Sequence, residues 1–306
     1  MKQLKTKTSI TVGIPAFNEE ANIGYIIRDL LAQNNKNYNL EAIIINSDGS
    51  TDNTVNEVKK IKSNKIILMD SKKRMGRTTR QNQIMKLASS RVLILIDADT
   101  QVKDKNFLDK ISSPIISGKA DLTSVRVEEL ETETFLEKIL ETSMKLKKYI
   151  FENINTGNNL YTCHGRARAF SKRLYKSIKF TDTVAEDAYS YLYCISKKMR
   201  YQFVSNTEIF YKLPVNYSDH KKQSIRFIKS REALNEEFGR DFVANNYKLP
   251  LRSSVTSLVK FFVKKPLHVF LYVVLFTYMK LKSITAGTKI TWDISQSSKK
   301  LRKSTI

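Results

Sequence analysis

The stretch Val92-Leu93-Ile94-Leu95-Ile96-Asp97-Ala98-Asp99-Thr100 decides how this chain folds. Its five consecutive aliphatic residues predict a strand that is buried on both faces, as in a parallel sheet covered by helices. Because side chains alternate along a strand, Asp97 and Asp99 point to the same side of the chain. Two carboxylates held this close together are suited to a hard divalent cation. Taken alone, the Asp-x-Asp pattern also fits a strand that ends in a solvated turn.

The composition is that of a globular protein with an unusual charge. Of the 306 residues, 41% are hydrophobic and 27% are charged, which is enough for a large core. Lys and Arg number 53 against 30 Asp and Glu, and the net charge of +23 favours polyanionic partners: nucleic acid, anionic lipid or phosphorylated substrates. Cys163 and Cys194 form neither a metal set nor a disulfide framework, and residues 1–5 lack the apolar core of a signal peptide. Both observations predict a cytosolic location.

Strand and helix patterns alternate through the first half of the chain. The predicted strands are residues 9–14, 40–45, 65–69 and 92–96, and the predicted helices are residues 23–31, 55–61 and 77–89. This order predicts right-handed βαβ units and a mostly parallel α/β sheet flanked by helices. The polar turns that follow the first, second and fourth strands then open on one edge of the sheet, where ligands bind. We therefore expect Asp48 to share a cleft with Asp97 and Asp99.

Four motifs in the first hundred residues carry a family resemblance. They are Ile14-Pro15-Ala16-Phe17-Asn18-Glu19-Glu20, Ser47-Asp48-Gly49-Ser50-Thr51-Asp52, Arg74-x-Gly76-Arg77 through Asn82, and Asp97-Ala98-Asp99. Together, and in this order, they resemble the motifs of family 2 glycosyltransferases. The resemblance implies a Rossmann-like GT-A fold and inverting transfer from a nucleotide sugar, with UDP the expected carrier and GDP the alternative. It also implies a Mn2+ or Mg2+ ion bound between Asp99 and the diphosphate, with Asp97 near the ribose and the metal.

The resemblance further implies which residues bind the nucleotide sugar. They are Pro15, Ala16, Phe17, Glu19, Asp48, Arg77, Asn82 and Asp97. Many members have two aspartates where this chain has Ser47-Asp48, so the base contact of the first aspartate has no counterpart here. Simpler roles stay open beside these, since Asn18 and Asp52 are typical helix caps and Asp48-Gly49 is a typical turn.

The second half of the chain contains the candidates for acceptor chemistry. A helical region is predicted at residues 128–151, and residues 163–171 resemble the acceptor-side strand of the family. Small residues at alternate positions from 165 to 169 predict that the backbone approaches a ligand on one face. Glu186-Asp187 resembles the Glu-Asp pair of the family, in which the aspartate is the general base of inverting members.

A carboxylate is what this chemistry requires. An acceptor hydroxyl attacks more readily when a base takes its proton, and a metal with basic side chains stabilises the departing diphosphate. Glu186 and Asp187 are therefore the predicted catalytic residues. The alternative is an acidic pair that only stabilises the dipole of a helix.

Gln223-x-x-Arg226-Phe227 resembles the Gln-x-x-Arg-Trp motif of polymerising members, with Phe in place of Trp. On a helix, residues three apart lie on one face, so both polar side chains can reach the cleft. Arg226 would bind the diphosphate and Gln223 the acceptor sugar. An ordinary basic amphipathic helix is the alternative.

The C-terminal part has no family resemblance, and we divide the chain into a catalytic domain at residues 1–235 and a helical extension at residues 236–306. The uncharged run at residues 266–279 is shorter than the roughly 20 residues that cross a bilayer. Its aromatic residues and flanking lysines predict a helix in the membrane interface, or a hairpin dipping into it, at residues 253–281. The basic residues 299–303 would add attraction to anionic lipid. A packed helix or an oligomer interface is the alternative.

Three classes of function follow. The first is a metal-dependent inverting glycosyltransferase, peripheral or shallowly inserted at the cytosolic membrane face, with a lipid-linked or polysaccharide acceptor; a homo-oligomer is left open. The second is a nucleic-acid-binding protein. The evidence against this class is that the basic residues are dispersed along the sequence and form no known nucleic-acid-binding motif. The third is a non-catalytic membrane scaffold with a nucleotide-binding fold, which has no need for Asp97, Asp99 and Asp187 together. The sequence does not identify the sugar or the acceptor.

Overall fold

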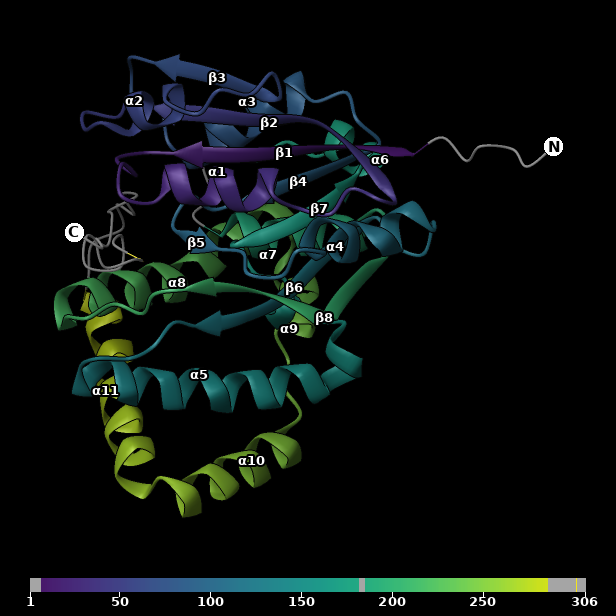
Figure 1. Cartoon of the computed structure of the whole chain (residues 1–306). Coiled ribbons are helices and arrows are strands. Elements are labelled where there is room, and N and C mark those ends of the chain that lie inside the picture. The colour runs from purple at the N-terminus through teal and green to yellow at the C-terminus, as the bar shows by residue number, and fades with distance from the viewer. Residues whose placement is uncertain (1–6, 182–184, 286–300, 302–306) are drawn as a thin grey trace.

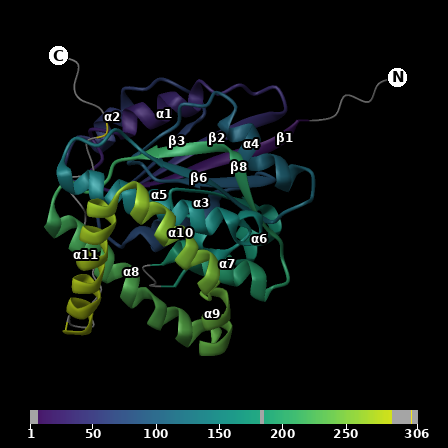
Figure 2. The same cartoon turned by 90° about the horizontal axis from the view of Figure 1, so that it is seen from below.

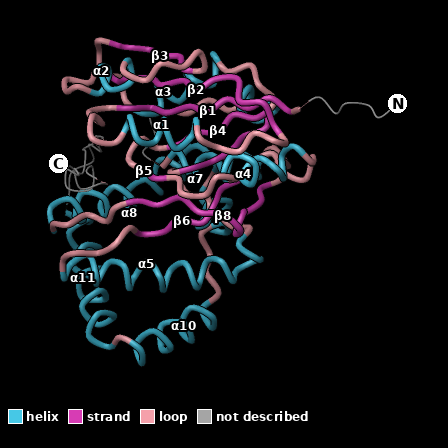
Figure 3. The backbone as a smooth tube through the Cα atoms, in the orientation of Figure 1, coloured by secondary structure: helices cyan, strands magenta, loops and turns pink. Residues whose placement is uncertain are grey.

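The computed structural model describes residues 7–181, 185–285 and 301, and its centre is a sheet of eight strands (Figures 1 and 3). The strands are β1 (Thr8–Ala16), β2 (Tyr38–Asp48), β3 (Ile66–Ser71), β4 (Val92–Ile96), β5 (Thr100–Gln101), β6 (Leu122–Glu129), β7 (Ala167–Ser171) and β8 (Tyr201–Tyr211). Their order in the sheet is β3-β2-β1-β4-β7-β6-β8-β5. Strands β1 to β4 pair in parallel, as do β6 and β8, whereas β7 and β5 are antiparallel to their neighbours. The prediction of a mostly parallel sheet is confirmed.

Helices cover both faces of the sheet. They are α1 (Ile23–Leu31), α2 (Thr54–Lys59), α3 (Arg77–Leu87), α4 (Phe107–Ile116), α5 (Phe135–Asn153), α6 (Lys172–Ser177), α7 (Glu186–Ser196), α8 (Tyr217–Phe238), α9 (Arg240–Asn246), α10 (Leu251–Lys264) and α11 (Pro266–Thr285), with short 3-10 turns at Ile154–Gly157 and Leu160–Thr162. On β4, the side chains of Val92, Ile94 and Ile96 pack into the core with α1 and α4. Those of Leu93 and Leu95 pack with α3, α6 and α7. Each is at most 1% exposed, and full burial of such a side chain contributes roughly 1.5–3 kcal/mol.

The prediction of a helix from residue 128 is wrong at its start. Glu128 lies in β6, which pairs with β8, and helix α5 begins only at Phe135. The start is fixed by a capping box: the Thr134 hydroxyl accepts from the N–H of Glu137, whose carboxylate accepts from the N–H of Thr134. Because β6 and β8 stabilise each other across a long sequence separation, neither strand was predicted.

The C-terminal helices form a separate layer. Figure 1 shows α5 between the sheet and α10, and Figure 2, seen from below, shows α10 and α11 at the near side of the molecule. None of the described helices is both long enough and apolar enough to cross a bilayer. Helix α8 runs through residue 235, the predicted domain boundary, and that boundary stays a prediction.

Candidate active site

The predicted metal motif lies where β4 ends, at the carboxyl edge of the sheet. A tight turn follows the strand: the N–H of Asp97 donates to the carbonyl of Arg166 (3.0 Å), and the Thr100 hydroxyl donates to the carbonyl of Asp97 (2.7 Å). The Asp97 side chain is 17% exposed and is bound by Arg77. Asp99 is half-buried, and no hydrogen bond or ion pair of its carboxylate is found within the described part of the chain. Asp99 is therefore free to bind a ligand.

Arg77 joins the metal motif to the Glu186-Asp187 pair. It is the first residue of α3, and its Nη2 donates to Oδ1 of Asp97 and to the carbonyl of Gly165 (3.1 Å). Its Nη1 lies 3.1 Å from Oε1 of Glu186. The guanidinium, whose fork of donors suits two carboxylates at once, thus holds together segments that are far apart in the sequence. Arg77 had been predicted to bind the nucleotide sugar, and that role stays a prediction.

The electrostatics of this cluster favour an added cation. Burial, the largest cause, raises the pKa of Asp97 to about 6; Arg77 opposes the rise, and the carboxylates of Asp99 and Glu186 add to it. Burial disfavours the charge on Arg77, but the carboxylates outweigh burial and raise the pKa of its guanidinium. A divalent ion would relieve the repulsion between Asp97 and Asp99.

The two members of the Glu-Asp pair have different surroundings. Glu186 is 3% exposed, and its carboxylate lies between Arg77 and the fully buried Arg168 (Nη2 to Oε1, 3.9 Å). Arg168 also fixes the start of α7, because its Nη1 donates to the carbonyl of Glu186 (2.6 Å) and to the hydroxyl of Ser190 (2.5 Å). Asp187 is half-buried, and its carboxylate accepts from the N–H of Ala188 (2.8 Å). Of the two predicted catalytic residues, Glu186 is thus positioned by arginines, and the role of Asp187 as the general base stays a prediction.

A thiol and a glycine lie against this pair. The thiol of Cys163 contacts the carbonyl of Asp187 (3.6 Å), and burial raises its pKa. A Cβ at Gly165 would lie 3.3 Å from Oε1 of Glu186 and 3.6 Å from Nη2 of Arg77, so the side chains close in around the glycine. The prediction that the whole small-residue face approaches a ligand is wrong, because Ala167 and Ala169 are fully buried in the core with α1 and α4.

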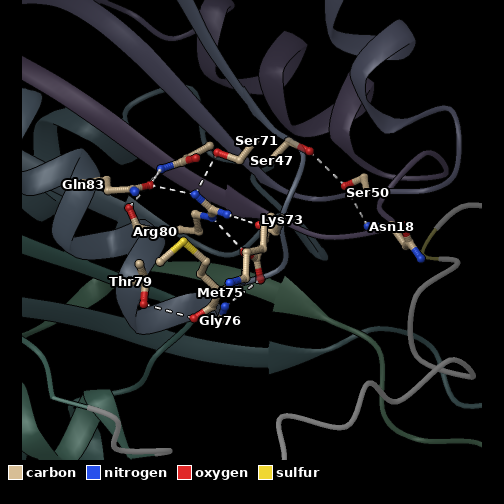
Figure 4. Close-up of polar contacts among 12 residues, drawn as sticks. Asn18, Ser47, Ser50, Ser71, Lys73, Met75, Gly76, Thr79, Arg80 and Gln83 are labelled. Carbon is tan, nitrogen blue, oxygen red and sulfur yellow. Dashed lines mark hydrogen bonds and ion pairs between the residues drawn. The ribbon is translucent and has the colours of Figure 1, made fainter.

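The loops after β1 and β2 form the other side of the site. The N–H of Asn18 donates to the Ser50 hydroxyl (3.2 Å; Figure 4). The Oδ1 of Asn18 accepts from the N–H of Thr51 (2.8 Å), and the two contacts hold the loops together. Asn18 has a φ of 52°, and it does not cap a helix. The Arg74 guanidinium lies over the ring of Phe17, 4.3 Å from its centroid. The structure brings to this edge four residues predicted for nucleotide binding: Pro15, Ala16, Phe17 and Glu19.

Asp48 holds the basic turn that precedes α3. It is 5% exposed, and its carboxylate accepts from the N–H of Met75 (2.7 Å), the N–H of Gly76 (2.9 Å) and Nε of Arg80 (2.7 Å). Arg80 itself is 2% exposed. Its other partners, drawn in Figure 4, are the Ser71 hydroxyl (2.7 Å), Oε1 of Gln83 (3.0 Å) and the carbonyl of Lys73. Asp48 therefore shapes the turn, and its contact with the nucleoside stays a prediction.

Three further residues were predicted to bind the nucleotide sugar: Asn82, Gln223 and Arg226. The amide of Asn82 exchanges two hydrogen bonds with the backbone of Phe180 (2.8 and 2.9 Å) and so anchors the chain a few residues before α7. Gln223 is half-buried on α8, and no hydrogen bond joins it to the cluster among the described residues. The side chain of Arg226 lies outside the described residues. Roles for these three in nucleotide-sugar binding stay predictions.

Three arginines of the site were not predicted: Arg80, Arg166 and Arg168. The alternation of small and large residues from 165 to 170 contained a signal, because it places 166 and 168 on one face. Arg168 reaches Glu186 only because of how α7 packs against the sheet, and the local sequence does not show this packing. Arg80 lies three residues after Arg77, and residues at this spacing share one face of a helix. The helical pattern alone therefore did not show that the two arginines have different partners.

No group of three or more His, Cys, Asp or Glu side chains that could hold a metal occurs in the described ranges. A cation at Asp97 and Asp99 would thus need further oxygen ligands from a substrate or from water. Mg2+, which keeps waters and takes one or two carboxylates plus substrate phosphates, fits such a site.

Solved structures resemble this fold at low sequence identity. A mannosyltransferase from Pyrobaculum calidifontis, solved with GDP-Man and Mn2+, has a TM-score of 0.59 and 13% identity over 92% of this chain and 77% of its own. Glucosyl-3-phosphoglycerate synthase from Mycobacterium tuberculosis, solved with Mn2+, UDP and glucosyl-3-phosphoglycerate, has a TM-score of 0.56 and 16% identity over 76% of this chain and 80% of its own. TarS from S. aureus has a TM-score of 0.52 and 18% identity over 92% of this chain and 88% of its own. These likenesses support the GT-A fold.

Comparison with curated proteins finds no match. Residues 11–179, more than half of the chain, match the family described as glycosyl transferase family 2. This range contains the four motifs of the first hundred residues and the strand β7. The chain therefore belongs to glycosyl transferase family 2, and it is a glycosyltransferase.

Proposed function

We propose that this protein is a metal-dependent, inverting glycosyltransferase that moves a sugar from a UDP-sugar, or alternatively a GDP-sugar, to a lipid-linked or polysaccharide acceptor. The observation that carries the proposal is the Arg77 contact, which puts Asp97 and Glu186 into one cluster. A group that serves the leaving diphosphate and a group that serves the attacking hydroxyl are needed at the same place.

In the proposed reaction, Asp187 takes the proton of the acceptor hydroxyl while its oxygen bonds to the anomeric carbon. The bond from that carbon to the diphosphate breaks in the same step, so one base is enough for inversion. The leaving diphosphate needs no proton, whereas glycosidases need a second carboxyl group to protonate theirs. Asp97 and Asp99 would hold Mn2+ or Mg2+, which supplies positive charge for the leaving group. The Mn2+ complexes of the two structural relatives support this metal.

A thermal-shift screen tests the proposal. The protein is measured with UDP, GDP, CDP and their sugars, each with and without Mn2+, because a ligand of the folded state raises Tm by mass action. We expect one nucleotide to stabilise the protein only when Mn2+ is present, and to lose this effect in Asp99→Asn. If no nucleotide stabilises the protein but duplex or single-stranded nucleic acid does, the nucleic-acid-binding function replaces the proposed glycosyltransferase function. Binding of metal and nucleotide without turnover of any sugar would favour the scaffold.

We also propose that the protein works at the cytosolic face of a membrane through α10 and α11. Both helices rest on α5 by aromatic contacts: Tyr149 with Phe261 (6.0 Å) and Phe135 with His268 (5.8 Å). Their outward residues form what we term the C-terminal apolar surface. It consists of Leu251, Val255, Leu258, Val259, Phe262, Val263, Leu267, Phe270, Val273, Val274, Phe276, Tyr278 and Leu281, each at least 38% exposed.

Charge indicates an anionic bilayer as the occupant of this surface. Between Asp241 and Asp293 the sequence has no acidic residue. Lysines flank the apolar residues at 260, 264, 265, 280 and 282. Each such cation near an anionic leaflet is worth about 1 kcal/mol, in addition to the burial of aromatic side chains.

Co-sedimentation with vesicles tests the membrane proposal. Vesicles of phosphatidylcholine alone, or mixed with phosphatidylglycerol, are compared for the protein and for the double variant Phe262→Glu with Phe270→Glu. We expect binding to the anionic vesicles and a loss of roughly tenfold or more in the variant, since each side chain contributes about 1.5–3 kcal/mol when buried. Leu87→Glu, at a 49% exposed residue of α3, is the matched control and should bind like the original. Equal binding of all three proteins would leave α10 and α11 as a packing or oligomer surface.

A further inference from the structure

Arg166 differs from the other arginines of the site. Arg77 and Arg168 are engaged by carboxylates, carbonyls or hydroxyls. The carbonyl of Arg166 accepts from Asp97, but no hydrogen bond or ion pair of its guanidinium occurs among the residues that the structure describes. Its Cζ instead lies 3.4 Å from the centroid of the Tyr211 ring, so the cation stacks on an aromatic face.

Tyr211 is a rigid support for this cation. It is 4% exposed, and its hydroxyl donates to Oε1 of Glu129 (3.1 Å), which also binds Lys148 (2.9 Å). Tyr211 is paired with Thr100, the residue directly after Asp99. The guanidinium is thereby held next to the metal motif, and holding it in advance reduces the rotamer entropy lost when it binds a partner.

The surroundings leave the charge of Arg166 available. Lys148 is bound by Glu128 (2.6 Å) and Glu129. Burial, together with the nearby charges of Arg166 and Lys148, lowers the pKa of His164 to about 3, so this imidazole is neutral at physiological pH. A half-buried cation without an anionic partner in the described protein is suited to an anion from outside.

The position of Arg166 separates it from the nucleoside side. In the sheet order, Phe17 and Asn18 directly follow β1, which lies with β2 on one side of β4. Arg166 directly precedes β7 and Tyr211 is the last residue of β8, and both strands lie on the other side of β4. An anion at Arg166 would therefore approach the metal motif from the acceptor side.

We propose that Arg166, stacked on Tyr211, binds a phosphate group of the acceptor, so that the acceptor is a phosphate-bearing molecule. The planar guanidinium can donate two parallel hydrogen bonds to two phosphate oxygens, whereas an ammonium group cannot match this geometry. This inference rests on the proposed function, because it names the chemistry of the acceptor in that reaction. The phosphate can belong to a lipid headgroup or to a soluble phosphorylated compound, and the two sources are distinguished below.

Calorimetric binding with UDP and Mn2+ present provides the test. The lipid arm compares farnesyl phosphate with farnesol, and the soluble arm compares glycerol 3-phosphate with glycerol. We expect the phosphate to bind roughly 10- to 100-fold more tightly than its alcohol in at least one arm, the range of a hydrogen bond to a charged group. A preference in the lipid arm alone assigns a lipid phosphate, and a preference in both assigns the phosphate itself.

Variants connect the preference to Arg166. Arg166→Ala should abolish it, Arg166→Lys should keep part of it, and both should bind UDP as the original protein does. Tyr211→Phe should keep most of the preference because the ring remains. The matched control is Arg28→Ala, which removes an exposed arginine 5.1 Å from the ring of Tyr25 on α1, and should change nothing.

Three results would overturn the inference. One is a preference that survives in Arg166→Ala, and another is a loss of UDP binding in that variant, which would assign Arg166 to the donor. The third is UDP binding with Mn2+ but no phosphate preference in either arm, which leaves the proposed function standing. If UDP does not bind the original protein at all, the proposed function fails and the inference fails with it.

Discussion

The two acidic pairs of the site, Asp97 with Asp99 and Glu186 with Asp187, are built alike although one follows a strand and the other begins a helix. In each pair the first member is bound by Arg77, and the second is not. Asp97 and Glu186 are therefore held by the protein, whereas Asp99 and Asp187 are half-buried and face fewer protein partners. The comparison teaches that Arg77 fixes the first residue of each motif and not the second, and it leads us to propose that the second residue of each pair serves the substrate.

The largest expected effect is at Asp99. Asp99→Asn should lower metal-dependent release of nucleotide from the donor by about 10³-fold or more, because charge stabilisation by a metal is worth several kcal/mol. Its Tm without ligands should stay unchanged. Asp70→Asn, at an exposed carboxylate of β3, removes the same charge and should keep full activity. Mn2+-dependent turnover in Asp99→Asn at the original rate would break the comparison.

Asp187 should come next. Asp187→Asn should lower kcat by roughly 10²- to 10⁴-fold, the usual contribution of a positioned base. Binding of UDP and Mn2+, measured by thermal shift, should persist because Asp187 does not belong to the metal motif. A kcat within tenfold of the original would show that another group takes the proton.

Glu186 should behave differently from its neighbour. Glu186→Gln should lower the free energy of unfolding by roughly 3–5 kcal/mol, because it leaves the fully buried Arg168 and the half-buried Arg77 without their shared carboxylate. Glu57→Gln breaks an exposed pair with Lys60 and should cost less than about 1 kcal/mol. Chemical denaturation measures both. If Glu186→Gln were as stable as Glu57→Gln, the distinction between the first and second members would be lost.

A double-mutant cycle sharpens the role of Arg77. Arg77→Met combined with Glu186→Gln should be less destabilised than the sum of the single variants, with a coupling of roughly 0.5–3 kcal/mol. A coupling near zero would mean that the contact of 3.1 Å contributes nothing to stability.

The last prediction concerns the pH dependence of stability and leaves activity at neutral pH unchanged. The pKa of His164 is lowered from 6.5 to about 3, so the unfolded chain takes up a proton that the folded chain does not, and the free energy of unfolding falls as the pH drops from 6.5 toward 3. Asp97, with its pKa raised from 3.8 to about 6, acts in the opposite sense: its contribution falls as the pH rises through that range. His164→Gln should therefore flatten the acid side of a plot of Tm against pH. An unchanged slope would exclude His164 as the cause.

The sequence was informative where the signal is local. Strand β4 was predicted at its observed bounds because five aliphatic residues end at an aspartate, and α1 because its apolar residues recur at the helix period. The placement of Asp97 and Asp99 followed from the same strand. Long-range partners were not predictable: β6 and β8 stabilise each other, and the contact between Arg77 and Glu186 depends on how α7 packs.

Asp48 illustrates the limit most clearly. The motif around it was identified correctly as part of the family pattern, and its position at the sheet edge was predicted. Its partners, the turn at Met75 and Gly76 and the buried Arg80, depend on a helix that follows β3. A residue type and a motif thus predicted the location of the side chain but not its contacts.

The burial of both thiols has a practical consequence for labelling. Cys163 is 3% exposed and Cys194 is fully buried, and burial raises the pKa of Cys194 to about 12. These are the only cysteines of the chain. Since the thiolate is the reactive form, neither should be alkylated by maleimide dyes in the folded state. The natural cysteines should therefore stay unlabelled. One cysteine introduced on the outer side of α10 would then carry a single fluorophore that reports on its surroundings.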